Sequence, residues 1–146
     1  MSILNFLFPD SKIIKETKKE AKIILKEFES IKGATGMNGT ERFIKPPIFN
    51  LLNDKKKHTQ FQNHLVDKGI TPKVWILRSV CAAAFHTASS GHNHLHRGFL
   101  SPMSGADTLP KIFIESQKKL VELNDLSKKS ADENYKTLNQ NILAVG

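Results

Sequence analysis

The sequence predicts an all-α fold, a single-domain helical bundle of four to six helices. Apolar residues recur at three- and four-residue steps in several stretches, which is the period of a helix with one buried face. No stretch shows the sustained alternation of polar and apolar residues that a half-buried strand requires. A length of 146 residues, with 39% hydrophobic and 25% charged residues, suits one globular domain over residues 1–146.

The most continuously apolar stretch predicts a buried central helix over about 72–90. Thr71 precedes it and can accept a hydrogen bond from an unpaired backbone N–H of the first turn. Pro72 suits the first helical position because that position needs no N–H donor. Residues 91–108 then lose the helical period and begin with a glycine, so we predict a long loop containing histidine and glycine. A connection of this length in a compact domain is often functional.

The N-terminal part predicts one long helix and one short one, separated by a connector. Asp10 or Ser11 can cap the long helix, whose apolar residues share one face. The connector covers 33–47 and contains glycine at every third position over its first seven residues. Pro46 and Pro47 predict extended backbone before the short helix, since proline disfavours the helical conformation of the residue before it.

Three more helices are predicted from capping signals and periodicity. Thr59 with Gln62 resembles a capping box, which would open a helix that stops at a glycine. The second of these three predicted helices covers about 108–128. Ser130 with Glu133 has the capping-box spacing again and predicts the start of the last helix.

Charge points to an anionic partner. The formal net charge is +8, carried by 19 lysines and three arginines. Positive charge of this size attracts nucleic acid or an acidic protein. The scarcity of arginine weakens this argument, because specific recognition of phosphates and bases relies on the two-pronged guanidinium group.

The single cysteine and the N-terminus bear on the compartment. Cys81 has no partner for an intramolecular disulfide, so we expect a reducing, cytoplasmic location. Residues 1–9 are apolar but too short to span a bilayer, and no positive charge precedes them as in a signal peptide. We interpret them as an apolar arm that docks on the core, in preference to the alternative of an anchor on a membrane surface.

Five lysines of the first long helix repeat at steps of three and four residues. At about 100° per residue they fall in one stripe opposite the apolar face. Aligned ammonium groups of this kind can follow a phosphate backbone or an acidic partner, or can simply be a solvated helix face. We call this stripe the lysine face; it consists of Lys12, Lys15, Lys19, Lys22 and Lys26.

The strongest candidates for metal ligands are four histidines at the end of the central helix: His86, His92, His94 and His96. Alternate residues of an extended chain point the same way, so three of them could meet a divalent metal such as zinc. The same stretch could bind an anion with the help of Arg78 and Arg97, or could have no ligand at all. No zinc-enzyme helix motif accompanies the histidines.

The residues therefore favour a small basic cytoplasmic protein that contacts an anionic partner, such as nucleic acid, through the lysine face. One alternative is an enzyme or ligand-binding protein with a metal or anion site within 86–97. Another is a structural or protein-docking helical module. Enzymatic activity is not predicted, and the sequence leaves the oligomeric state open.

Overall fold

The computed structural model describes residues 11–29, 44–89 and 108–145. These residues form six α-helices and one short 3₁₀ helix, with no strand among them, so the predicted all-α class and helix number are confirmed. The apolar arm, most of the 33–47 connector and the long loop after the central helix lie outside the described residues. The α-helices in chain order are α2 (Lys12–Glu29), α3 (Lys45–Leu52), α4 (His58–Lys68), α5 (Pro72–Ser89), α7 (Thr108–Glu122) and α8 (Lys128–Val145).

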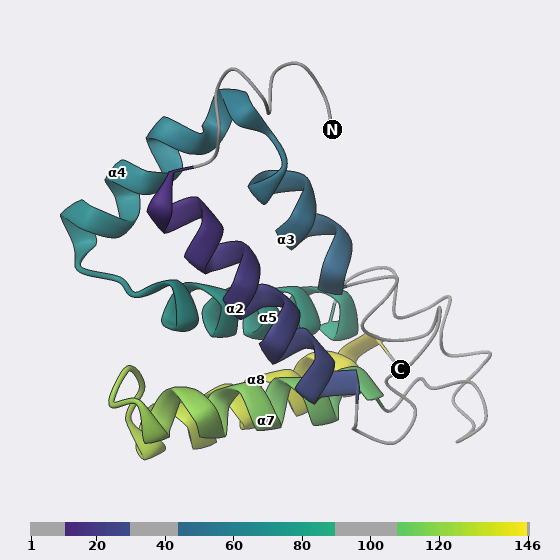
Figure 1. Ribbon diagram of the computed structural model, residues 1–146. Helices are drawn as coiled ribbons and strands as arrows, with labels where there is room; N and C mark the ends of the chain where they lie inside the picture. The colour runs from purple at the N-terminus through teal and green to yellow at the C-terminus, as the bar shows by residue number, and fades with distance from the viewer. Residues whose placement is uncertain (1–10, 30–43, 90–107, 146) are drawn as a thin grey trace.

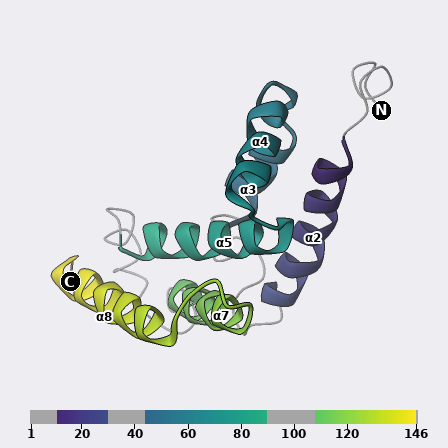
Figure 2. The same ribbon diagram turned by 90° about the vertical axis from the view of Figure 1, so that its left-hand side faces the viewer.

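Helix α5 lies in the middle of the molecule, as the sequence predicts for its most apolar stretch. It separates α3 and α4 from α7 and α8, and α2 crosses beside it (Figures 1 and 2). Its most extensive contacts are with α7 and then with α2, while α8 packs against both α5 and α7 less closely. A helix with neighbours on several sides needs apolar residues around most of its circumference, which explains its composition.

One apolar cluster joins all six helices. Its members on α5 follow the helical period, and α2 and α7 contribute long apolar faces to the same cluster. Helix α8 contributes Leu138, which is fully buried. The largest apolar side chains with almost no exposed surface are Phe28, Ile14, Leu25, Ile44, Ile48, Leu52, Ile76, Leu77, Ile112, Leu138 and Val80.

Two predicted helix starts are confirmed by their capping bonds. The backbone N–H of Val74 donates to the Thr71 hydroxyl at 3.2 Å, and Pro72 is the first residue of α5. At α2 the backbone N–H of Ile14 donates to the Ser11 hydroxyl at 3.4 Å. Short polar side chains satisfy N–H groups that no earlier carbonyl can reach.

The prediction of extended backbone at Pro46 and Pro47 is wrong. Both prolines lie in the first turn of α3, which begins at Lys45, so the last residues of the 33–47 connector are helical. The first turn is where a helix tolerates proline, because those N–H groups have no partner within the helix.

The predicted capping box at Thr59 is also wrong. Helix α4 begins one residue earlier, continuing from a 3₁₀ turn over Lys55–Lys57. That turn is capped by Asp54, whose carboxylate accepts from the Lys56 N–H at 3.1 Å. The amide of Gln62 donates instead to the Ser11 hydroxyl at 2.6 Å, which ties α4 to the start of α2.

Helices α7 and α8 meet at a turn that comes earlier in the chain than the sequence predicts. Helix α7 ends at Glu122 because Asn124 takes a left-handed conformation with φ 59°. The Asn124 and Asp125 N–H groups then donate back to the carbonyls of Val121 and Leu120, closing the helix end. Helix α8 is capped by Ser127, which accepts from the Ser130 N–H at 3.1 Å, and not by Ser130.

Candidate functional site

The lysine face of α2 is fully presented to the surroundings. All five of its lysines are exposed, whereas the opposite side of the same helix is buried. The two faces are separated because lysines and apolar residues follow the same helical period half a turn apart. The buried residues of α2 are Ile14, Thr17, Ala21, Ile24, Leu25 and Phe28.

None of these five lysines forms an ion pair with a described carboxylate. Two of the glutamates on α2 are already engaged with other helices: Glu27 pairs with Lys119 of α7 at 3.3 Å, and Glu29 pairs with Lys45 of α3. Glu16 and Glu20 lie along one edge of the stripe and make no ion pair within the described chain. The positive charge of the lysine face is therefore not neutralised by a direct partner within the described ranges.

The lysine face is long and regular. Its first and last members, Lys12 and Lys26, are fourteen positions apart in the sequence, which corresponds to about 21 Å along the helix axis. Successive ammonium groups are offset by about 4.5 or 6 Å along that axis. The arrangement is a straight row of positive charges and not a concave cluster around one small anion.

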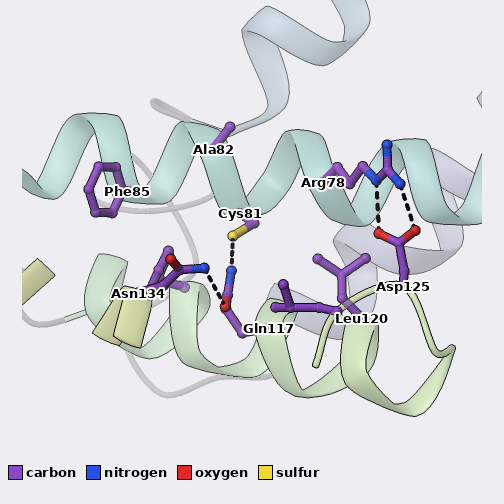
Figure 3. Close-up of a pocket in the computed structure, with 10 residues that line it drawn as sticks. Arg78, Cys81, Ala82, Phe85, Gln117, Leu120, Asp125 and Asn134 are labelled. Atoms are coloured by element: carbon purple, nitrogen blue, oxygen red, sulfur yellow. Dashed lines mark hydrogen bonds and ion pairs between the residues drawn. The ribbon is translucent and has the colours of Figure 1, made fainter. Parts of the chain in front are cut away.

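Arg78, the other described anion-site candidate, already has a partner. Its Nε and one terminal nitrogen donate to the two carboxylate oxygens of Asp125 at 2.8 and 2.6 Å (Figure 3). The guanidinium lowers the pKa of the Asp125 carboxyl, and the carboxylate raises the pKa of Arg78. This ion pair joins α5 to the turn between α7 and α8.

A second polar group lies deeper between the same helices. The Gln117 amide of α7 donates to the Cys81 sulfur at 2.7 Å and accepts from the Asn134 side chain of α8 at 3.2 Å (Figure 3). Burial raises the pKa of the Cys81 thiol, which holds it in the protonated form. The arrangement suits a structural thiol and not a catalytic nucleophile.

The predicted histidine site falls mostly outside the described residues. His92, His94, His96 and Arg97 all belong to that part of the chain. His86 is exposed on α5 and lines a groove between α3 and α5. Within the described ranges, no group of three or more His, Cys, Asp or Glu side chains is placed to hold a metal ion.

His58 is one of the few buried polar residues of the described chain. Its Nε2 donates to the Leu52 carbonyl at 2.6 Å. That carbonyl lies at the end of α3, where no later N–H of the helix can satisfy it. His58 therefore joins the end of α3 to the start of α4.

Sequence reasoning also missed Gln117, Asp125 and Asn134. Their hydrogen-bond partners lie 36, 47 and 17 residues away in the sequence, so no short-range spacing predicts these contacts. The Asn-Asp pair at 124–125 was the available signal for Asp125, because asparagine often ends a helix in the left-handed conformation.

Comparison with protein-family models, with curated proteins and with solved structures found no match to this chain. Among the helices described, none is long and apolar enough to cross a membrane.

Proposed function

We propose that the protein binds a polyanion, with nucleic acid as the first partner to test, through the lysine face of α2. One observation carries the proposal: five exposed lysines form a row of about 21 Å and have no ion-pair partner among the described carboxylates. A row of this shape complements a linear chain of phosphates better than it complements one compact anion.

The chemistry of lysine limits the proposal to the phosphate backbone. A lysine ammonium acts as a point charge and does not offer the paired donors that read a base edge. The exposed side of α2 carries no aromatic side chain on which a base could stack. We therefore expect binding that depends on charge and not on base sequence, with a dissociation constant of roughly 10⁻⁴ to 10⁻⁶ M at physiological salt.

The test measures the salt dependence of binding to a fluorescently labelled 20-base-pair DNA by fluorescence anisotropy. If all five lysines contact phosphates, log K should fall against log salt with a slope of about −4.5. Raising salt from 50 to 200 mM would then weaken binding by about 500-fold. An affinity that is absent at 50 mM salt, or that ignores salt, would contradict the proposal.

A matched pair of variants separates the lysine face from net charge. The test variant changes its five lysines to glutamine. The control variant changes five other exposed lysines to glutamine and so has the same net charge: Lys68, Lys73, Lys128, Lys129 and Lys136. The proposal expects the test variant to lose most of the salt slope and the control to keep most of it. Equal loss in both would show general charge attraction and overturn the assignment to α2.

A further inference from the structure

A pocket of about 400 Å³ lies where α5, α7 and α8 meet (Figure 3). Its volume falls within the range of roughly 300–1,000 Å³ that is usual for small-molecule sites. It lies on α5, α7 and α8, whereas the lysine face is on α2, so a ligand here would be independent of polyanion binding.

The wall of this pocket is mostly apolar and partly aromatic. Phe85 of α5 and Phe113 of α7 contribute rings whose centroids are 5.5 Å apart at an interplanar angle of 41°. Leu120 and Leu126 add aliphatic surface. Tilted rings beside aliphatic side chains favour a flat, apolar ligand body over a flexible polar one.

The charges at the pocket compensate one another. Arg78 and Asp125 line it together, and their two hydrogen bonds neutralise both groups. The Cys81 thiol carries no charge, since burial opposes its ionisation. A charged ligand would lose hydration on entry and would find no unpaired opposite charge in this lining, so the pocket selects against ions.

Gln117 supplies the polar contact. Gln117 lines the pocket and is only 6% exposed. One N–H of its side-chain amide donates to Cys81, and one lone pair of the amide oxygen accepts from Asn134. An amide group has two N–H donors and two acceptor lone pairs. Within the described chain, one donor and one acceptor of this buried amide are thus left for a ligand.

We propose that the pocket between α5, α7 and α8 binds a neutral aromatic small molecule bearing a carboxamide or similar uncharged hydrogen-bonding group, with Gln117 as its polar partner.

The test titrates the full ¹⁵N-labelled chain with 2-naphthamide and follows amide resonances by NMR. The expected result is saturable shifts of the Gln117 and Asn134 side-chain NH₂ signals, with 2-naphthoate binding at least tenfold more weakly. Shifts centred on another groove, or equal affinity for the charged naphthoate, would overturn the proposal.

Two variants locate the site. Ala82→Phe places a ring at an exposed position that lines the pocket, and it should weaken 2-naphthamide binding at least tenfold. Because Ala82 also lines the α3–α5 groove, the control is His86→Phe, an exposed position that lines that groove and not the pocket between α5, α7 and α8. Binding weakened by both Ala82→Phe and His86→Phe would place the ligand in the α3–α5 groove, which both residues line, and would contradict the proposal. If Ala82→Phe fails to fold, the wild-type shift map alone decides.

Discussion

The lysine face of α2 and the pocket between α5, α7 and α8 differ in whether their polar groups have partners within the protein. In the pocket the charge of Arg78 meets Asp125, and the buried amide of Gln117 meets partners from two other helices. On α2 five ammonium groups in a row meet no described carboxylate. Polar groups that the chain pairs with itself hold helices together, whereas unpaired charges remain available to another molecule.

The largest effect on stability is expected at Gln117. Gln117→Leu removes the donor to Cys81 and leaves the Asn134 side chain without its acceptor, so the free energy of unfolding should fall by about 1 kcal/mol. Urea denaturation measures this change, and DNA affinity should stay the same. Gln60→Leu, at an exposed position of α4, is the control and should change stability little. A variant as stable as wild type would mean that the buried amide is not structural.

A smaller effect is expected at the ion pair. Asp125→Asn should lower the free energy of unfolding by about 0.5 kcal/mol near neutral pH, because the pair is partly exposed and solvent screens it.

The contribution of Asp125 should also depend on pH in one direction. Its folded pKa is lowered below the unfolded value of about 3.9, so the stabilisation is present above that value and disappears as pH falls through the folded pKa. Chemical denaturation from pH 7 to pH 2 should show the wild-type and Asp125→Asn curves converging at the acid end. Asp67→Asn, an exposed change on α4, should cause no loss at any pH. Curves that diverge on acidification would refute this role for the carboxylate.

The smallest effect on stability is expected on the lysine face. Changing its five lysines to glutamine should alter the free energy of unfolding by less than about 0.5 kcal/mol, or raise it slightly at low salt, because like charges three and four residues apart repel. Thermal unfolding at 20 and 200 mM salt measures this. A large loss of stability would show that these lysines are structural and would remove the contrast between the two regions.

The fold class and the buried and exposed faces of the main helices could be predicted, because they depend on the spacing of apolar and charged residues along the sequence. Apolar spacing predicts the buried sides of α2, α5 and α7, and the same period places the five lysines together on the exposed side of α2. Thr71 and Ser11 are local capping signals, and the structure confirms both.

Helix boundaries and side-chain pairings are harder to predict from the sequence. A boundary depends on which of two neighbouring capping residues is used, and a pairing joins residues that are far apart in the sequence. Ser127 and Ser130 are both suitable capping residues for α8. Ser127 is the one that caps the helix, because it lies directly after the α7–α8 turn and accepts from the Ser130 N–H. The left-handed residue Asn124 turns the chain so that the carboxylate of Asp125 reaches Arg78, which is 47 residues away in the sequence. The predicted metal ligands His92, His94 and His96 remain a prediction, as does the cytoplasmic location.

The single tryptophan gives the molecule an uneven optical signal. Trp75 packs edge-on against Phe61 of α4, with ring centroids 4.7 Å apart at 76°, and it lines the α3–α5 groove. Its fluorescence therefore reports the junction of α5 with α3 and α4, while the α7–α8 side contributes Tyr135 on an exposed surface of α8. Tryptophan fluorescence therefore reports unfolding on the side of α5 where α3 and α4 lie, above α5 in Figure 1, whereas circular dichroism reports the loss of all the helices. Coincident transitions by the two methods would mean that both sides of α5 unfold as one unit.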